Sequence, residues 1–416
     1  MELNEIKEVT ITGIDHYGRG IGKIDGCVIF IPNTLVDEKV KVKITTVKKD
    51  YLEGEVIDFL NISEKRITPK CPYFYECGGC DLMHMDYQEQ LLFKETKVKE
   101  IMQKFAGIDN NLVKEIISSD DLFNYRNKIA FQVKKGKIGF CKKKSYDLVD
   151  IDNCLISDEK MNKILKLIKE KIGLYGIEQV IIRSCKNTDD LMIILDINRP
   201  IDEEKIIKTL SDIASSIIKK IRNKYTVIVG NDYIIEKLGD LSFIISPSSF
   251  FQVNTKQTVK LYNKVLEYAK LTGKEKVLDL YCGTGTIGLY LSRYCKEVLG
   301  VEINKDAIKD AFKNKELNNI KNIDFKCGDV SNIIDSINFK PDIIVVDPPR
   351  SGLDQYTINQ LIKINPEKII YVSCDPITLA RDLNLLKEHY EIKEITPVDM
   401  FVNTYHVENV VLLTRL

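Results

Sequence analysis

The chain has 416 residues, which is too long for one ordinary domain, and 44% of them are hydrophobic, enough for packed cores. Its 61 basic and 61 acidic side chains balance, which argues against a protein that coats nucleic acid indiscriminately. The 11 cysteines are an odd number for a secreted disulfide framework, and the chain shows neither a long apolar run nor a signal-peptide pattern. We therefore expect a soluble, cytoplasmic protein of two or three domains, with no membrane association.

Residues 1–62 have the pattern of a small all-β unit. Five short runs rich in β-branched residues are separated by glycine, Asp-Gly and Pro-Asn turns. This spacing predicts a small barrel of the oligonucleotide-binding kind. The segment holds eight basic and eleven acidic residues, so any contact with RNA must come from one face or loop.

Residues 63–240 mix helices with strands and open with a cysteine cluster. The stretch "CPYFYECGGC" contains Cys71, Cys77 and Cys80. Structural zinc sites usually pair cysteines two to four residues apart, whereas three close cysteines plus one distant ligand favour an iron–sulfur cluster. The spacing leaves three candidates for the fourth ligand, namely Cys141, Cys154 and Cys185. Farther on, the pattern predicts a helix over 160–173, followed by strands in "EQVIIRSCKN" and "LMIILDI".

A basic stretch lies within this middle segment, at residues 121–144. It holds one acid and eight basic residues, which are Arg126, Lys128, Lys134, Lys135, Lys137, Lys142, Lys143 and Lys144. Four aromatic residues are interleaved with them, namely Phe123, Tyr125, Phe131 and Phe140. Cations that neutralise phosphates and rings that stack on bases suit RNA. Taken alone, a solvated lysine-rich hairpin is the slightly favoured interpretation.

Residues 241–416 alternate apolar strands with amphipathic helices, from "KVLDLYCGTGTIGLYLSRY" to the terminal "VENVVLLTRL". This alternation predicts an α/β fold with a mostly parallel sheet covered on both faces. Ligands of such sheets bind at the carboxyl ends of the strands. The remaining motifs all lie at those ends.

The stretch "DLYCGTGTIG" ends one strand and opens a helix. Gly283, Gly285 and Gly288 match the dinucleotide pattern G-x-G-x-x-G, and Glu302 lies near the expected ribose-binding distance. A nicotinamide-dependent oxidoreductase is therefore one alternative.

Three acids favour S-adenosylmethionine instead. Asp279, inside the strand before the glycines, suits the cationic amino-acid end of that ligand, and Asp329, in "CGD", suits its adenine amino group. In "VVDPPRSGL", Asp347 stands at a rigid corner of the ligand crevice. We favour the methyl donor.

Near the C-terminus, "KIIYVSCDPITLARD" predicts a core strand over 368–372 that Asp375-Pro376 terminates. Cys374 follows this strand. A free cysteine is by default a small buried hydrophobe, and the alternative is a catalytic nucleophile.

The order "FFQVN", "DLYCGTG", "GVE", "DPPRSG", "YVSCDP" and "HVENVVLL" resembles the RNA uracil-5-methyltransferases, from about residue 9 to the end. More specifically, it resembles the ribosomal RNA branch, which carries an N-terminal TRAM barrel and an iron–sulfur cluster. The resemblance implies a TRAM-like RNA-binding barrel at 1–62, a central α+β iron–sulfur domain at 63–240 and a Rossmann-like methyltransferase domain at 241–416. The chain departs from the family at Asp375, where members usually have Asn and could donate an amide hydrogen bond.

By this resemblance Cys374 is the nucleophile and Glu408 the base. Uracil C5 is too weakly nucleophilic to take a methyl group unaided, whereas thiolate attack on C6 gives an enolate-like C5 that can. A base must then remove the C5 proton so that the thiolate can be eliminated. The sequence alone does not show how the thiol pKa is lowered.

The resemblance also implies the other site residues. The contacts with S-adenosylmethionine are Gln252, Tyr281, Glu302 and Asp347, to which the glycine turn and the "CGD" stretch add Gly283, Gly285 and Asp329. Phe250 meets the flipped-out target base. Cys154 completes a [4Fe-4S] cluster with Cys71, Cys77 and Cys80.

The expected partner is RNA, contacted in part by Arg126 and Lys128 of the basic stretch. Ribosomal RNA of the 23S type is the preferred substrate and transfer RNA the alternative. A non-catalytic iron–sulfur RNA-binding protein is a third interpretation, and the intact Cys374 and Glu408 argue against it. We expect a monomer.

Overall fold

The computed structural model describes residues 2–334 and 338–416. Contacts between Cα atoms divide the chain into two compact units. The first comprises the chain up to Lys97 with Phe140–Val149 and Phe401–Tyr405, and the second comprises Val98–Gly139, Asp150–Met400 and His406–Leu416. The division into three domains drawn from the sequence stays a prediction. No helix within the described ranges has both the length and the apolarity needed to cross a membrane.

The first unit begins with a six-stranded sheet in the order β1-β5-β6-β4-β3-β2. Its strands are β1 (Ile6–Thr10), β2 (Gly13–Ile14), β3 (Gly20–Ile24), β4 (Cys27–Ile31), β5 (Lys39–Val47) and β6 (Tyr51–Asn61). In β5 buried and more exposed residues alternate, because successive side chains of a strand point to opposite faces. The extra strand relative to the five predicted runs is the two-residue β2.

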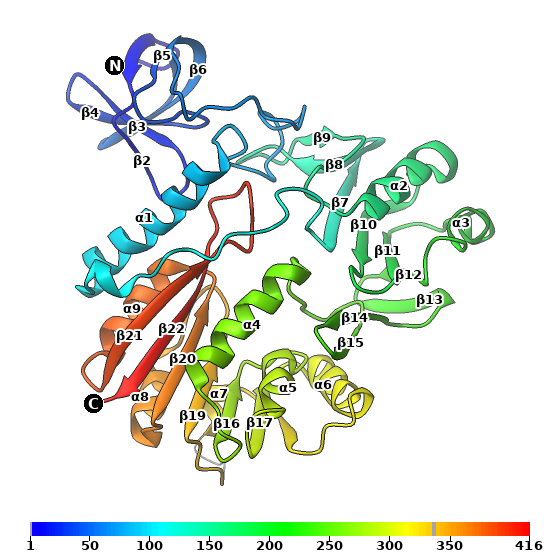
Figure 1. Cartoon of the computed structure of the whole chain (residues 1–416). Coiled ribbons are helices and arrows are strands. Elements are labelled where there is room, and N and C mark those ends of the chain that lie inside the picture. Colours follow the sequence, from blue (N-terminus) through cyan, green and yellow to red (C-terminus); the bar gives the residue numbers. More distant parts are fainter. Residues whose placement is uncertain (1, 335–337) are drawn as a thin grey trace. The chain divides into compact units, whose positions relative to one another are not determined.

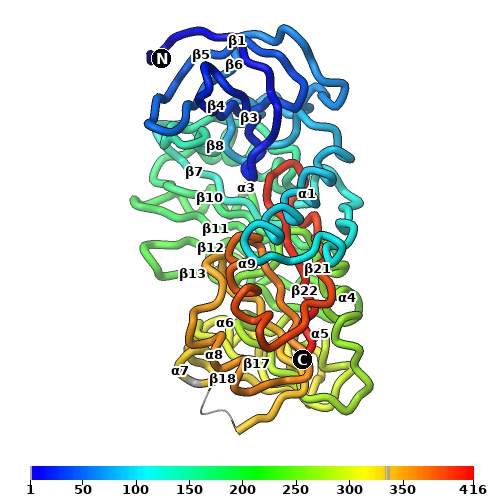
Figure 2. The backbone as a smooth tube through the Cα atoms, turned by 90° about the vertical axis from the view of Figure 1, so that its left-hand side faces the viewer, coloured from blue at the N-terminus to red at the C-terminus, as the bar shows by residue number. Residues whose placement is uncertain are grey.

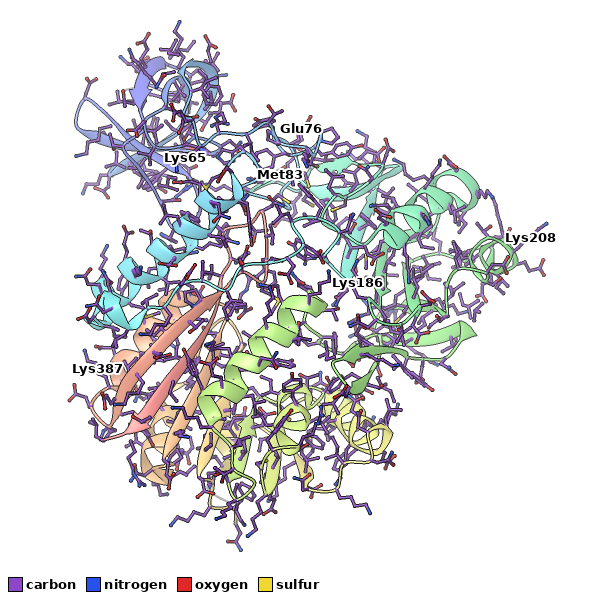
Figure 3. All side chains as sticks on the ribbon, in the orientation of Figure 1. Lys65, Glu76, Met83, Lys186, Lys208 and Lys387 are labelled. Atoms are coloured by element: carbon purple, nitrogen blue, oxygen red, sulfur yellow. The ribbon has the colours of Figure 1, made fainter. Side chains whose placement is uncertain are left out.

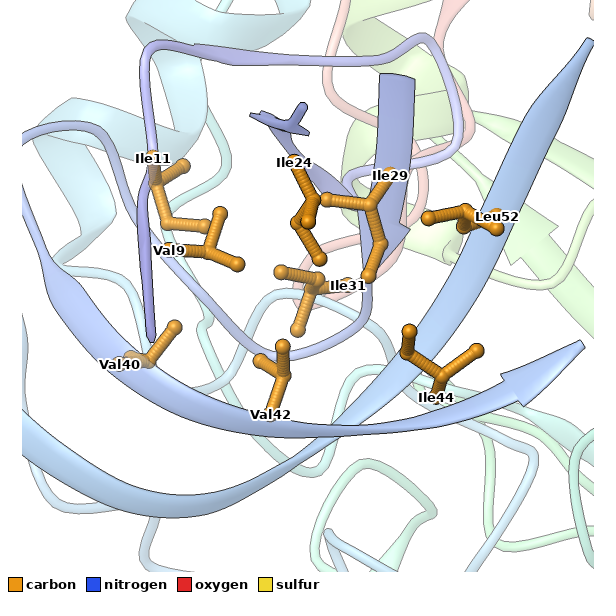
Figure 4. Packing of buried hydrophobic residues seen from close by; sticks show 9 residues of the cluster. All are labelled: Val9, Ile11, Ile24, Ile29, Ile31, Val40, Val42, Ile44 and Leu52. Carbon is orange, nitrogen blue, oxygen red and sulfur yellow. The ribbon is translucent and has the colours of Figure 1, made fainter. Parts of the chain in front are cut away.

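Aliphatic side chains fill the interior of this sheet (Figure 4). The cluster consists of Val9, Ile11, Ile24, Ile29, Ile31, Val40, Val42, Ile44 and Leu52. Strands β4 and β5 supply five of these side chains, β1, β3 and β6 supply one each, and Ile11 follows β1. Burial of these branched side chains provides the main stabilisation of so small a unit.

Between β6 and helix α1 (Tyr87–Ala106) the chain is irregular and carries Lys65, Glu76 and Met83 (Figure 3). The cysteine stretch lies here, and the Gly78 amide donates to the Cys141 carbonyl at 3.0 Å. A Cβ on Gly78 would lie 2.8 Å from that carbonyl oxygen, so glycine is required. The loop Phe401–Tyr405, red in Figure 2, lies beside the first half of α1, where Lys94 donates to the Phe401 carbonyl at 3.0 Å.

The second unit contains most of a seven-stranded sheet in the order β13-β12-β11-β10-β7-β8-β9. The strands are β7 (Lys128–Lys134), β8 (Lys137–Cys141), β9 (Leu148–Asp150), β10 (Ile177–Ser184), β11 (Leu191–Ile197), β12 (Ser216–Ile221) and β13 (Lys224–Gly230). The helical elements of this part are η1 (Asn110–Leu112), α2 (Glu159–Leu167), η2 (Ile168–Ile172) and α3 (Glu203–Leu210). The predicted helix over 160–173 is confirmed, with its last turn widened into the π-helix η2 before Gly173.

A short hairpin, β14 (Ile234–Leu238) and β15 (Leu241–Ile245), leads into the last sheet, whose order is β18-β17-β16-β19-β20-β22-β21. The strands of that sheet are β16 (Lys276–Leu280), β17 (Glu297–Glu302), β18 (Ile323–Cys327), β19 (Ile343–Val346), β20 (Lys368–Ser373), β21 (Tyr390–Val398) and β22 (Glu408–Arg415). Five of them pair in parallel and β22 is antiparallel to both neighbours, so the predicted mostly parallel sheet is confirmed.

Helices cover both faces of this sheet (Figure 1). They are α4 (Thr255–Ala269), α5 (Thr286–Ser292), α6 (Lys305–Leu317), α7 (Val330–Ile333), α8 (Gln355–Ile364) and α9 (Pro376–Leu386). In Figure 1, α4, α5 and α6 lie in front of the strands, whereas α8 and α9 lie behind them. The carboxyl ends of β16, β17, β19 and β20 thus meet at one edge, where a ligand of such a sheet binds.

Candidate active site

The glycine turn after β16 has the backbone shape that its residues allow. Tyr281, Gly283 and Gly285 all have positive φ, at 63°, 55° and 78°. A Cβ on Gly285 would lie 2.7 Å from the Phe325 ring, so this glycine is required for packing. Beside Gly283, by contrast, nothing lies within 4 Å of where a Cβ would be, which leaves a ligand room to approach the backbone.

Asp279 lies beneath this turn and is fully buried. Its Oδ2 accepts the Gly288 amide at 2.8 Å, but its Oδ1 accepts no hydrogen bond from any described residue. Burial, together with the nearby Asp347 and Glu302, raises the pKa of Asp279 to about 8. An unpaired buried carboxyl of this kind fits a ligand that brings a positive charge or a donor.

The other acids of the site follow the strand ends. Glu302, the last residue of β17, accepts the amide of Gly283 at 3.1 Å and that of Asn304 at 2.7 Å. Asp347 directly follows β19, and burial raises its pKa to about 7. We name Asp279, Glu302, Asp347 and Glu408 the acidic cluster.

The acidic cluster bears on the choice between the two cofactors. Carboxyl groups that raise one another's pKa lie in a region of negative potential. Such a region attracts the sulfonium and ammonium groups of S-adenosylmethionine and repels the pyrophosphate of a nicotinamide dinucleotide. The residues therefore fit the methyl donor better.

Asp329 and Gln252 are also predicted contacts of the methyl donor. Asp329 caps α7, and its Oδ1 accepts the amide and the hydroxyl of Ser331 at 2.9 and 2.6 Å. Gln252 is buried, and its backbone carbonyl accepts the side-chain amide of Asn127 at 3.0 Å.

Cys374 and Glu408 come together through strand pairing. Ser373, the last residue of β20, is opposite Asn409 in antiparallel β22. Cys374 follows Ser373 and Glu408 precedes Asn409. In an antiparallel pair, these two residues are therefore the next to face each other across the strands. Glu408 is 4% exposed, whereas Cys374 is of intermediate exposure.

Burial disfavours the ionised forms of both Cys374 and Glu408. Burial raises the pKa of Cys374 to about 12, and Glu408 is the next contributor. Burial likewise raises the pKa of Glu408 to about 8, with Asp347 adding to the rise. The Arg350 guanidinium acts in the opposite direction on both groups.

The chain also places helix α9 directly after the cysteine. Pro376 is its first residue, and the Asp375 carboxylate caps it by accepting the amides of Ile377 and Thr378 at 2.9 and 3.2 Å. Aspartate thus serves here as an acceptor, a role that the oxygen of Asn could also fill. Because the N-terminus of a helix favours negative charge, α9 and Arg350 are the features that can stabilise the Cys374 thiolate.

Burial distinguishes the two neighbouring phenylalanines. The Phe250 side chain is 67% exposed, whereas Phe251 is 5% exposed and lies 6.2 Å from Phe243, ring centroid to ring centroid. Phe251 is thus a core residue, and Phe250 is available to a ligand.

Most of the basic stretch has another explanation than RNA. Tyr125 and Phe131 are fully buried core residues rather than stacking platforms. The last three lysines pair with acids of the first unit, Lys142 with Glu76, Lys143 with Asp81 and Lys144 with Glu53. This finding fits the lysine-rich hairpin interpretation of that part.

Arg126 and Lys128 differ from those lysines. The Arg126 Nε donates to the Lys128 carbonyl at 3.0 Å. Burial, together with the charges of Arg183 and Arg126, lowers the pKa of Lys128 to about 8. A cationic group of this kind suits an anion such as a phosphate.

The metal prediction receives no geometric support. Across the part of the chain that the structure describes, no three His, Cys, Asp or Glu side chains are arranged to hold a metal ion. Cys71, Cys77, Cys80 and Cys154 are all of intermediate exposure.

Sequence reasoning missed three residues at the site. Tyr262 of α4 donates to or accepts from Thr286 at 2.7 Å, and burial with three members of the acidic cluster raises its pKa. Arg350 is part of the "DPPRSG" motif, and this motif could have identified it from the sequence. Arg183 lies in a strand with no recognisable motif, so only the structure could find it.

Comparisons with known proteins agree with this geometry. Residues 86–416 match the family tRNA (Uracil-5-)-methyltransferase, and residues 2–57 match the TRAM domain. A Clostridium tetani protein described as an uncharacterized RNA methyltransferase is 41% identical, with 100% of this chain and 97% of that one covered. A Staphylococcus epidermidis protein of the same description is 39% identical, with 100% and 98% covered.

A solved structure is also similar along nearly the whole chain. It is the Pyrococcus abyssi tRNA (uracil-54, C5)-methyltransferase in complex with S-adenosyl-L-homocysteine, with 30% identity and a TM-score of 0.81. The match covers 98% of this chain and 99% of that one. These findings decide against the oxidoreductase alternative. The chain belongs to the RNA uracil-5-methyltransferases, S-adenosylmethionine-dependent enzymes that methylate uracil C5 in RNA, and it carries an N-terminal TRAM domain.

Proposed function

We propose that Cys374 is the nucleophile and Glu408 the base of uracil-5 methylation. The observation that carries this proposal is that Cys374, which follows β20, faces Glu408, the first residue of β22 and a member of the acidic cluster. The two groups must reach C6 and C5, which are neighbouring atoms of one ring, so a nucleophile and a base at adjacent strand ends suit the reaction.

The steps follow from these residues. The Cys374 thiolate bonds to uracil C6, and the electron pair of the C5–C6 double bond moves to C5 and its conjugated carbonyl. When bound, S-adenosylmethionine supplies an electrophilic methyl group on a sulfonium. Once C5 is methylated, Glu408 takes the C5 proton, the double bond re-forms and the thiolate of Cys374 leaves. Each turnover therefore returns the cysteine unchanged and transfers one proton to Glu408.

Glu408 must be ionised for its step, and its raised pKa makes it a stronger base once it is. The positive charge of a bound methyl donor would favour ionisation of both Glu408 and Cys374. Arg350 and the N-terminus of α9 would act in the same direction. Phe250 would stack on the flipped-out base, and Arg126 and Lys128 would contact RNA phosphates.

The substrate we propose is a uridine of 23S ribosomal RNA. Its support is the combination of the TRAM domain with the cysteine stretch, which resembles the ribosomal RNA branch. Transfer RNA is the second candidate, and the similarity to the Pyrococcus abyssi tRNA methyltransferase favours it. Methylation assays on ribosomal and transfer RNA lacking the modification distinguish the two, because only the true substrate accepts a methyl group at one mapped uridine.

The test of the chemistry is a trapping experiment with RNA containing 5-fluorouridine. Fluorine at C5 cannot be removed as a proton, so the enzyme should remain bonded to C6 after methyl transfer. We expect an adduct that survives denaturation, depends on S-adenosylmethionine and is absent with Cys374→Ala. An adduct that persists with Cys374→Ala would refute the assignment of the nucleophile.

For the cysteines, we propose that Cys71, Cys77, Cys80 and Cys154 hold a [4Fe-4S] cluster. The support is the chemistry of the donors and their spacing, since three thiols within ten residues suit iron–sulfur ligation. Its role would be structural, because methyl transfer needs no electron. Iron and sulfide analysis of anaerobically purified protein tests this proposal. Protein that folds normally with neither element bound, or with zinc instead, would refute it.

A further inference from the structure

The exposed Phe250 ring stands at the end of a short segment, residues 246–250, between β15 and α4. Within this segment, one backbone bond is formed, from the Ser249 amide to the Ser246 carbonyl at 3.2 Å. A single turn of this kind does not hold a protruding ring in one place. The position of Phe250 therefore depends on groups outside the segment.

One such group is Arg183, on β10 of the other sheet of the second unit. Its side chain is 3% exposed, and its Nη2 donates to the Ser249 carbonyl at 2.5 Å and to the Pro247 carbonyl at 3.3 Å. Its Nε finds no hydrogen-bond partner among residues 2–334 and 338–416. A buried guanidinium is costly, and its hydrogen bonds here go to this segment.

The second group is Asp310, on α6, with 2% of its surface exposed. Its carboxylate accepts the Ser246 hydroxyl at 2.7 Å and also the Ser249 hydroxyl. Its negative charge favours the charged form of Arg183, so each of these buried ions offsets part of the cost of the other. Ser249 thus connects the two, through its carbonyl to Arg183 and through its hydroxyl to Asp310.

The chain after Phe250 is held as well. The side-chain amide of Asn127 donates to the Gln252 carbonyl at 3.0 Å, and its backbone amide donates to Val253 at 2.8 Å. Phe250 therefore lies between two fixed points, one on each side along the chain.

We propose that Arg183 and Asp310 are positioning residues for the target base, which hold residues 246–250 so that the Phe250 ring meets the flipped-out uracil. This inference rests on the proposed role of Phe250. A preformed stacking ring offsets part of the cost of taking the base out of its stack. The hydrogen bonds of both side chains go to segment 246–250 and not to any of the predicted contacts of the methyl donor.

The test compares four variants with the wild type: Arg183→Met, Arg183→Lys, Phe250→Ala and the double variant Arg183→Met/Phe250→Ala. The rate of adduct formation is measured at subsaturating 5-fluorouridine RNA, and S-adenosylhomocysteine affinity is measured by calorimetry. Loss of one base–aromatic contact should slow adduct formation on the order of 10-fold. We expect that loss for Arg183→Met and for Phe250→Ala, and no further loss in the double variant, because both changes remove the same contact.

Two further results should accompany this. Arg183→Lys should regain part of the rate, and S-adenosylhomocysteine affinity should stay at the wild-type value in every variant. The matched control is Lys220→Met, which removes a cation from β12 of the same sheet, where Lys220 pairs with Asp196 at 2.6 Å. This control should not change the rate.

The proposal would be overturned if the double variant slowed adduct formation by the product of the two single effects, because Arg183 and Phe250 would then act independently. An equal loss of S-adenosylhomocysteine affinity would also overturn it, by showing general damage to the fold. If Arg183→Met does not fold, Ser249→Ala removes one connection and should show the same lack of additivity with Phe250→Ala. Absence of any adduct with the wild type on ribosomal and transfer RNA would instead refute the proposed function.

Discussion

Replacing Glu408 by Gln should make the protein more stable at high pH while preventing it from completing its reaction. Glu408 is 4% exposed, and burial and the charge of Asp347 raise its pKa from 4.5 to about 8. Between these two pH values the folded protein holds a proton that the unfolded chain has lost. The native state therefore binds more protons, and the free energy of unfolding falls as the pH rises through this window.

The magnitude follows from the size of the pKa rise. Each tenfold change in an acid constant corresponds to about 1.4 kcal/mol, so a rise from 4.5 to about 8 costs roughly 4 to 5 kcal/mol once the pH exceeds 8. Glutamine cannot ionise and avoids this cost. We expect Glu408→Gln to be more stable than wild type by a few kcal/mol at pH 9 and by less than about 1 kcal/mol at pH 5.

The assay is thermal unfolding of both proteins without ligand at pH 5 and pH 9. The gain at pH 9 should raise the Tm by on the order of 5 to 10 °C. Glu297→Gln is the matched control, because Glu297 is half exposed and pairs with Lys276 at 3.1 Å, so its replacement should show no such gain. A Tm difference for Glu408→Gln that is equal at both pH values would refute the electrostatic reasoning.

Three other predictions follow from the site. Affinity for S-adenosylmethionine should rise between pH 6 and 8, where Asp347 and Asp279 with pKa values of about 7 and about 8 ionise, and the rise should be smaller for the sulfonium-free S-adenosylhomocysteine; parallel calorimetric curves would contradict this. Gly285→Ala should cost about 1 to 3 kcal/mol in denaturant unfolding and weaken S-adenosylhomocysteine binding, because its φ is 78° and the new Cβ would lie 2.7 Å from the Phe325 ring. Asp375→Asn should leave the stability unchanged, whereas Asp375→Ala should cost about 1 kcal/mol, since only alanine removes the cap of α9; equal losses would show that the carboxylate charge matters instead.

Much of the second unit could be predicted locally. The strands around "KVLDL" and "KIIYVS", and the glycine turn that opens a helix, each depend on residues close together in the chain, and the structure confirms them. The π-helical turn η2 and the two-residue β2 were not predicted, because both are small departures from regular geometry that residue patterns do not reveal.

The basic stretch shows the limit of local patterns, which left two interpretations open. Eight basic and four aromatic side chains within residues 121–144 suit RNA binding. In the folded chain, however, Tyr125 and Phe131 are buried, and Lys142, Lys143 and Lys144 form ion pairs with acidic residues. Composition states which residues are present, but not which side chains become buried or which residues they contact.

The sequence by itself determined the class of fold and the family and predicted the residues of the site, because motif order and hydrophobic period are properties of the linear chain. Only the tertiary structure decided that Cys374 and Glu408 face each other, that Phe250 is exposed while Phe251 is buried, and that Arg183 and Asp310 both make hydrogen bonds to Ser249. Those facts depend on strand register, burial and charge between residues far apart in the chain, and these exist only once the chain has packed.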